Sequence, residues 1–99
     1  PYVLEWNRTA IEAKMVRLAA WLGLAERSFS GVLAWVLELR RALGIPHTLA
    51  DIGVRAEHAR SFAPQALNDP STGGNPLPMT EQDFAQLYGA CIAGSLRAG

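Results

Sequence analysis

The segment Asn68-Asp-Pro-Ser-Thr-Gly-Gly-Asn-Pro-Leu-Pro-Met-Thr80 divides the chain and decides how the rest of it is interpreted. It holds three of the six prolines and two adjacent glycines. Because proline lacks a backbone donor and fixes its own φ angle, we expect no regular helix or strand here. A polar loop of this kind between two helices is either a connector or a functional edge, and the composition leaves both open.

The composition predicts one small domain whose surface is unusually apolar. The chain has 99 residues, enough for a single domain with a modest core. Charged residues make up 18% of it and hydrophobic residues 49%, whereas charged residues reach about 25% in a typical soluble domain. A small domain should be more polar than average, because it has more surface for its volume. We therefore expect protein outside this chain to cover part of its apolar surface.

Residue counts exclude several classes of function. Nine basic and nine acidic residues give a formal net charge of zero, which argues against a nucleic-acid-binding surface. The single cysteine, Cys91, excludes an internal disulfide framework and a cysteine-based zinc site. No segment has the length of a membrane span or the pattern of a signal peptide, so we expect a cytoplasmic protein. Because the chain opens with Pro1 instead of methionine, we expect a piece of a longer protein or a processed product.

The first part of the chain predicts one clear helix after an ambiguous start. The short apolar segment from Pro1 to Trp6 fits either a strand or the tail of a helix. Thr9-Ala-Ile-Glu12 has the spacing of a capping box, in which each side chain satisfies a backbone N–H of the other residue. Apolar residues at helical spacing then predict a helix to about Leu22, ended by Gly23 in the left-handed conformation.

A second helix, capped by Ser28 or Ser30, is expected to run to about Leu43. Apolar residues occupy nearly all of its circumference, so it should be buried on most sides, and four helices cannot surround it well. We therefore predict an exposed apolar patch on this helix in the isolated chain. Complete burial of Val32, Val36 and Leu43 within one chain would contradict that prediction.

The remaining elements complete an all-α prediction of four main helices plus one short helical turn. Thr48-Leu-Ala-Asp51 predicts the turn, which Gly53 ends. A third helix should span residues 56–67, with a kink or an early break at Pro64. Thr80-Glu-Gln-Asp83 predicts the cap of a last helix with a regular apolar stripe. The final residues, 94–99, are expected to fray.

Several motifs resemble the iron-containing alcohol dehydrogenases. Asp69-Pro-Ser-Thr-Gly-Gly-Asn-Pro76, followed by a capped helix close to the C-terminus, resembles the closing signature of that family. Pro1-Tyr-Val-Leu4 followed by Asn7 resembles the family's Pro-His-Val-Met/Leu followed by Asn. The resemblance covers nearly the whole chain, and its Thr-Gly-Gly-Asn-Pro core is fairly specific. Four further features fall in the family's order: Lys14, the Gly23 stop, Leu43-Gly-Ile-Pro46 and Asp51-Ile-Gly-Val54.

The resemblance implies a two-domain parent enzyme with a fold like that of dehydroquinate synthase. An N-terminal α/β domain binds NAD(P), and a divalent metal, iron or zinc, is held by one aspartate and three histidines of an all-helical C-terminal domain. The metal polarises the alcohol or carbonyl oxygen while the nicotinamide gives or takes a hydride. Residues 1–99 would be the last part of the helical domain, beginning just after the final metal ligand. The resemblance therefore implies no catalytic, cofactor-binding or metal-binding residue in this chain.

Two departures from the family pattern bear on the site. Tyr2 stands where many members carry a histidine that is not a metal ligand. Ser71 stands where some members carry a cysteine that borders the substrate cavity, so Ser71 is carried over as a residue beside the site. Pro64 is also unusual for its helix. We expect one edge of the substrate cleft to consist of Ser71, Thr72, Gly73, Gly74 and Asn75.

Two functions remain open at this point. The first is the C-terminal segment of an NAD(P)-dependent, metal-requiring alcohol dehydrogenase, which has the remainder of the parent enzyme as its partner and no activity alone. The alternative is a stand-alone helical interaction module that binds itself or a partner through its apolar surface. The excess of apolar residues fits both functions, and self-association of the isolated chain is expected.

The other conspicuous side chains are expected to be structural. Cys91 lies on an apolar stripe and should be a buried, inert thiol. Core or domain-contact positions are expected for Trp6, Trp21 and Trp35. Solvent-exposed positions are expected for His47, His58, Arg40 and Arg41.

Overall fold

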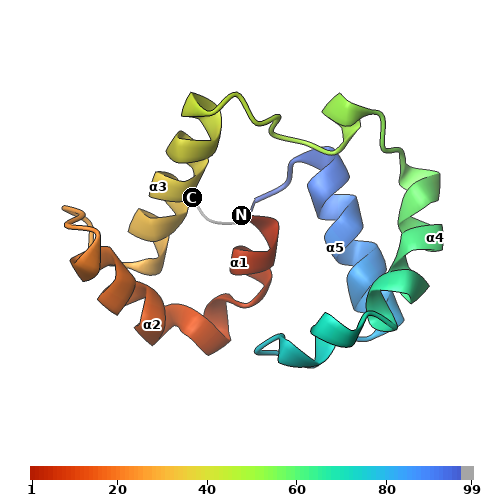
Figure 1. The fold of residues 1–99 in the computed structure, drawn as a ribbon, viewed down its shortest axis with the longest axis horizontal. Helices are drawn as coiled ribbons and strands as arrows, with labels where there is room; N and C mark the ends of the chain where they lie inside the picture. Colours follow the sequence, from red (N-terminus) through yellow and green to blue (C-terminus); the bar gives the residue numbers. More distant parts are fainter. Residues whose placement is uncertain (97–99) are drawn as a thin grey trace.

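The computed structural model describes residues 1–96, and within that range every regular element is a helix and there is no strand. The all-α prediction is confirmed. Residues 97–99, on which part of the expected fraying falls, lie outside the described residues. Figure 1 shows the helices in order. The α-helices are α1 (Tyr2–Trp6), α2 (Arg8–Trp21), α3 (Phe29–Ala42), α4 (Ala56–Leu67) and α5 (Glu81–Ala93), and the 3₁₀ helices are η1 (Ala50–Ile52) and η2 (Pro70–Gly74).

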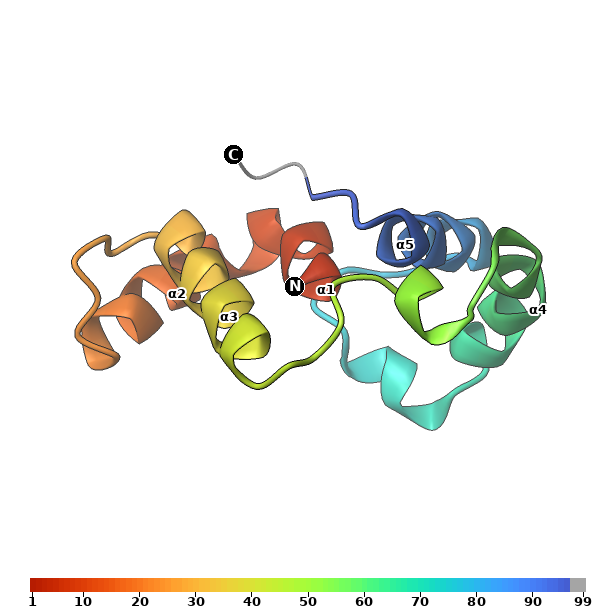
Figure 2. The same ribbon diagram turned by 90° about the horizontal axis from the view of Figure 1, so that it is seen from above.

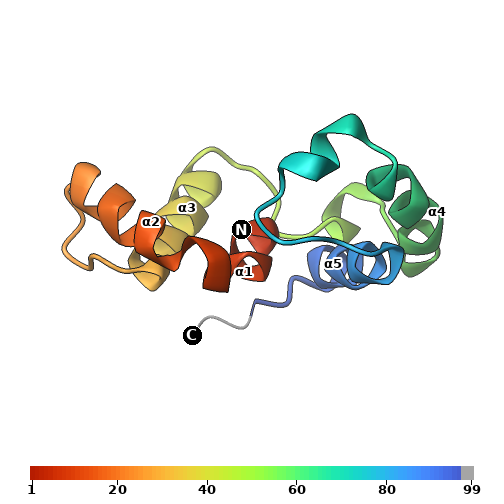
Figure 3. The same ribbon diagram turned by 90° about the horizontal axis from the view of Figure 1, so that it is seen from below.

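The helices form two pairs with α1 between them. Helix α2 packs against α3, and α4 packs against α5, while α1 contacts α5. The same division is visible from above in Figure 2 and from below in Figure 3. The molecule measures 40 × 29 × 22 Å along its principal axes. This elongated arrangement leaves each pair of helices with a separate, small core.

One core lies between α2 and α3. Ile11, Phe29 and Leu33 are buried there, and Leu4 and Met15 pack against them half-buried. Between α4 and α5 the buried side chains are small, so the two helices pack mainly through aromatic and half-buried side chains. The rings of Phe62 and Tyr88 lie 5.7 Å apart across this second interface, and the buried alanines beside them are Ala59 and Ala63.

The start of α2 corrects one prediction. Residues 1–6 form the short helix α1, so the helix-tail alternative holds for them and the strand alternative does not. Helix α2 begins at Arg8, and Thr9 lies inside it, so the predicted capping box of Thr9 and Glu12 is wrong. Only Asn7 separates the two helices, and its nearly helical backbone lets α2 begin earlier than the capping pattern indicates. Glu12 instead forms an ion pair with Arg8 at 3.6 Å.

Helix α3 begins and ends where its cap residues indicate. The Ser28 hydroxyl accepts a 3.0 Å hydrogen bond from the Gly31 backbone N–H, and Gly44 adopts a φ angle of 73° beyond the helix. The predicted exposed apolar patch is confirmed on the outer face. Val32 is buried and Val36 is half-buried on the inner face. The outer face is exposed by 40% at Trp35, 43% at Leu39 and 66% at Leu43.

Helix α4 spans the predicted residues and continues through Pro64 to Leu67, so the early break expected at Pro64 is wrong. The missing proline N–H orphans the carbonyl of Arg60, which lies on the exposed side of the helix, where water can satisfy it. The Pro64 carbonyl oxygen then accepts hydrogen bonds from the backbone N–H of Asn68 at 3.1 Å and from its side-chain amide at 2.9 Å. These bonds close the end of the helix.

Candidate functional site

The loop after α4 contains a short helix that the sequence did not predict. Pro70–Gly74 form the 3₁₀ helix η2, so the expectation of no regular helix in this segment is wrong. The Asp69 carboxylate accepts a 2.7 Å hydrogen bond from the backbone N–H of Ser71, which caps the first turn. Pro70 suits the first helical position, because its fixed φ angle is already helical and its missing N–H is not needed there. The loop is therefore a defined structure, held from within.

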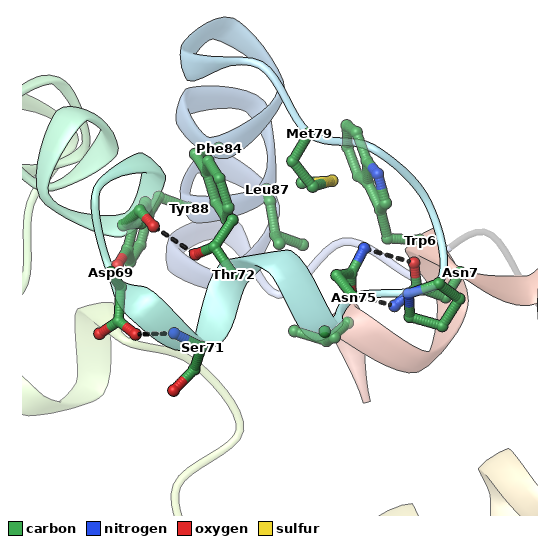
Figure 4. Close-up of a pocket in the computed structure, with 14 residues that line it drawn as sticks. Trp6, Asn7, Asp69, Ser71, Thr72, Asn75, Met79, Phe84, Leu87 and Tyr88 are labelled. Carbon is green, nitrogen blue, oxygen red and sulfur yellow. Dashed lines mark hydrogen bonds between the residues drawn. The ribbon is translucent and has the colours of Figure 1, made fainter.

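Two side-chain contacts anchor this loop to the rest of the molecule. Near its start, the Thr72 hydroxyl donates a 2.5 Å hydrogen bond to the carbonyl oxygen of Ala66 in α4. At its end, the side-chain amides of Asn75 and Asn7 form two reciprocal hydrogen bonds of 2.7 and 2.9 Å. Asn7 lies between α1 and α2, so the second anchor joins residues 68 positions apart. Figure 4 shows both anchors on either side of η2.

A cavity of about 630 Å³ opens between this loop, α1 and α5. One wall is polar and comes from the loop, whereas the opposite wall is apolar and aromatic and comes from α1, α5 and the segment before α5. In Figure 4 the indole of Trp6 and the side chain of Met79 lie on the far side of the cavity from Asp69 and Ser71. The apolar wall comprises Val3, Trp6, Met79, Phe84 and Leu87.

Four of the five residues predicted at the cleft edge line this cavity. They are Ser71, Thr72, Gly74 and Asn75, and Gly73 does not contribute to the lining. The hydroxyl of Ser71 points away from the Asn7–Asn75 pair (Figure 4). Contact of the predicted cleft-edge residues with substrate stays a prediction. Sequence reasoning did not identify Asn7 or the aromatic wall as parts of the site, although Asn7 belongs to the motif that begins at Pro1.

A second polar cluster lies outside this cavity, around His47. Arg40 and the His47 Nδ1 atom are 2.5 Å apart, and the His47 Nε2 atom lies 3.2 Å from the carbonyl oxygen of Gly94. Because Arg40 can only donate, Nδ1 must accept, which leaves Nε2 to donate to Gly94. His47 is exposed, as predicted, yet it joins α3 to the end of α5.

Other predicted side chains also have more specific surroundings than expected. His58 is half-buried, accepts a 2.8 Å hydrogen bond from the Arg55 backbone N–H and stacks on Phe62, so its assignment as a plain surface residue is wrong. Cys91 is half-buried, and burial raises the pKa of its thiol above the ordinary value. Trp21 is 89% exposed, so of its two predicted roles the core position is wrong.

Within residues 1–96, no three His, Cys, Asp or Glu side chains gather closely enough to hold a metal ion. The side chains that surround the cavity offer hydroxyl and amide groups and one carboxylate, Asp69, which already accepts the Ser71 N–H. A metal centre of the kind implied by the resemblance would therefore need ligands from elsewhere. Over the same described residues, no helix is both long and apolar enough to cross a membrane.

Known proteins match this chain along nearly its whole length. The model of the C-terminal region of the Fe-containing alcohol dehydrogenase family matches residues 1–92. Lactaldehyde reductase of Escherichia coli K12 is 34% identical over 94 residues, which cover 89% of this chain and 25% of that protein. Choline dehydrogenase of Bacillus subtilis 168 is 27% identical over 96 residues, which cover 91% of this chain and 24% of that protein. No solved structure gives a significant match.

The chain spans about a quarter of the length of these relatives, and the matched family region is the C-terminal one. Its entirely helical architecture over the described residues agrees with that placement. The loop that carries Thr72-Gly-Gly-Asn-Pro76 is anchored to α4 and to Asn7 and borders the cavity of about 630 Å³. On these grounds the chain belongs to the iron-containing alcohol dehydrogenase family, as the C-terminal helical part of such a protein.

Proposed function

We propose that residues 1–99 form a helical subdomain that completes the C-terminal domain of a metal-requiring, NAD(P)-dependent alcohol dehydrogenase. The parent enzyme would transfer a hydride between an alcohol and a nicotinamide cofactor. Family membership supports this proposal, as do the names of the relatives, one a reductase and the other a dehydrogenase. The remainder of the parent enzyme would be the partner of this chain. A cytoplasmic location stays a prediction.

The observation that carries the proposal is the position of the signature loop against the cavity. Ser71, Thr72, Gly74 and Asn75 line the cavity together with aromatic side chains that include Trp6 and Phe84. A small alcohol needs a polar group for its oxygen and apolar contacts for its carbon chain. The Ser71 hydroxyl makes no hydrogen bond within residues 1–96 and is exposed. Because this hydroxyl points away from Trp6, Met79 and Leu87 in Figure 4, a rotation about the χ1 angle of Ser71 is needed to bring it to the oxygen of a substrate in the cavity.

This chain would contribute shape and orientation to the reaction, and the other parts of the parent would contribute the redox chemistry. The described residues do not form a metal site, so no step of metal catalysis is assigned to them. A metal held by residues outside this chain would polarise the substrate oxygen. The loop would then restrict where the substrate can lie, because both of its ends are anchored.

The gene tests this proposal directly. We expect the reading frame to continue upstream of Pro1 and to encode a nucleotide-binding domain with aspartate and histidine metal ligands. The full-length product, assayed with iron or zinc and with NAD⁺ or NADP⁺, should oxidise alcohols. The 99-residue chain alone should show no such activity. A start codon directly before Pro1, or metal-dependent alcohol oxidation by the isolated chain, would contradict the proposal.

The exposed face of α3 favours a second candidate, a stand-alone interaction module. Trp35, Leu39 and Leu43 lie at helical spacing on this face and are all exposed, so water contacts a continuous apolar stripe. In the parent enzyme the remaining domains would cover this stripe, whereas in a stand-alone module a second copy or another protein would cover it. The module would be favoured if the natural protein had a mass of 10.7 kDa and sedimented as a dimer. The dimer should then be lost in Trp35→Lys but retained in Lys14→Glu.

A further inference from the structure

The side chain of Asn7 is placed unusually for a residue at the start of a helix. Asparagine at this position normally accepts a hydrogen bond from a backbone N–H of the first turn. Asn7 precedes α2 directly, yet its side chain makes no such cap. The residue is only 4% exposed, and its amide faces Asn75 instead. A local capping bond has thus been replaced by a contact with a distant loop.

The geometry of the pair fixes the orientation of both amides. The Asn75 Nδ2 atom donates to the Leu77 carbonyl oxygen at 2.8 Å. Because a carbonyl oxygen can only accept, the amide atom that faces Leu77 must be the nitrogen. The same nitrogen donates to Asn7 Oδ1 at 2.9 Å, and Asn75 Oδ1 accepts from Asn7 Nδ2 at 2.7 Å. Each polar atom therefore has a partner. Replacing either donor with an acceptor would bring two oxygens together in a buried environment, which would destabilise the folded state.

The pair is also the link between the two walls of the cavity. Asn75 ends η2, which carries Ser71 and Thr72 on the polar wall, and Asn7 follows α1, which carries Trp6 on the aromatic wall. We infer that Asn7 is a positioning residue for the alcohol site, because its amide holds Asn75 and with it the Ser71 wall at a fixed distance from α1. The inference rests on the proposed function, and it assigns to Asn7 a role in substrate binding that acts through Asn75.

The first test compares Asn7→Ala with a matched control in the full-length enzyme. Asn68→Ala removes a side-chain amide hydrogen bond of similar length, 2.9 Å, at the start of the same loop, but on the exposed surface and within one helix end. We expect Asn7→Ala to raise the KM for the alcohol about tenfold while the KM for the nicotinamide cofactor stays unchanged. Asn68→Ala should leave both constants at their wild-type values. Simple loss of folded enzyme would lower kcat without this selective change in KM.

The second test uses Asn7→Asp, which keeps the shape of the side chain. A protonated aspartic acid can donate to Asn75 Oδ1 as the amide does, whereas an ionised one presents an oxygen there. Burial and the facing Asn75 carbonyl oxygen both disfavour the charged form and so raise the pKa of such a carboxyl group, and protonation becomes accessible as the pH falls. We expect the alcohol KM of Asn7→Asp to approach that of the wild type at low pH and to rise about tenfold at high pH. This variant still decides the question if Asn7→Ala does not fold.

The outcomes separate this inference from the proposed function. An inactive wild-type full-length protein would overturn the proposed function itself. An active wild type whose Asn7→Ala variant keeps the wild-type alcohol KM would overturn the role of Asn7 alone. A parallel pH dependence of KM in Asn7→Asp, Asn68→Ala and the wild type would overturn it as well.

Discussion

The hydroxyl of Tyr2 donates a 2.6 Å hydrogen bond to the backbone carbonyl oxygen of His47, 45 residues further along the chain. This bond joins α1 to the connector between α3 and η1. Tyr2 is buried, at 8% exposure, so water cannot readily replace the bond. The contact therefore ties the central helix to the turn that leads from one pair of helices to the other.

Removing this hydroxyl should weaken the molecule measurably. We expect Tyr2→Phe to lower the free energy of unfolding by about 1 kcal/mol, because a partly buried hydrogen bond is lost. Tyr88→Phe is the matched control. The Tyr88 ring contacts Phe62, and its hydroxyl makes no hydrogen bond within the described residues. Urea denaturation of both variants measures the difference, and equal midpoints would refute the assigned role of the Tyr2 hydroxyl.

The two threonines with capping patterns should respond differently to alanine. The Thr80 hydroxyl accepts a 3.1 Å hydrogen bond from the Asp83 N–H, and the Asp83 carboxylate accepts one from the Thr80 N–H at 2.9 Å. We expect Thr80→Ala to cost about 1 kcal/mol of stability. Thr9 lies inside α2 and caps nothing, so Thr9→Ala should change stability by less than about 0.5 kcal/mol. Thermal unfolding followed by circular dichroism distinguishes the two variants.

Two glycines within helices offer a similar contrast. A Cβ atom at Gly31 would lie 2.0 Å from the backbone oxygen of Glu26, so Gly31→Ala requires the backbone to move. We expect a loss of about 1–3 kcal/mol. A Cβ atom at Gly89 in α5 meets nothing within 4 Å, and alanine is the better helix former, so Gly89→Ala should stabilise by about 0.5–1 kcal/mol. Chemical denaturation of the two variants should therefore give shifts of opposite sign.

The Cys91 thiol should be protected in the folded chain. Burial raises the pKa of this thiol, so the folded state holds the proton more tightly than the unfolded state does. The associated stability is present in full below the pKa of the unfolded thiol and is lost as the pH rises through the higher folded value. Iodoacetamide should react more slowly with the folded chain than with the chain in urea at the same alkaline pH. Equal rates would show that the thiol is not shielded. The Cys91→Ser variant measures the reaction of iodoacetamide with groups other than this thiol.

Sequence reasoning worked where a few neighbouring residues determine the structure. Ser28 and Thr80 cap the helices that follow them, and Gly23 and Gly44 end the preceding helices with positive φ angles of 70° and 73°. It failed at Thr9, where a good capping pattern was overridden because α1 already leads the chain into α2. Local chemistry specifies a cap only when the chain arrives at the helix from an extended conformation.

The motif indicated which residues belong to the candidate site, but it did not indicate their contacts. The resemblance selected residues 71–75, and four of those residues line the cavity. The pairing of Asn7 with Asn75 depends on how α1 and the loop meet in space, so no local pattern of either segment contains it. The same holds for the Phe84 and Trp6 wall, since an apolar stripe does not say which of its members face a cavity.

The arrangement in two helical pairs has a consequence for the order in which the chain folds. Helices α2 and α3 are neighbours in sequence, as are α4 and α5, so each pair can form soon after it leaves the ribosome. Helix α1 finds its partner α5 only after α2, α3 and α4 have been synthesised. The Asn7–Asn75 pair can form only once residue 75 has been made, and truncation before α5 should leave the α2–α3 pair intact while α4 loses its partner.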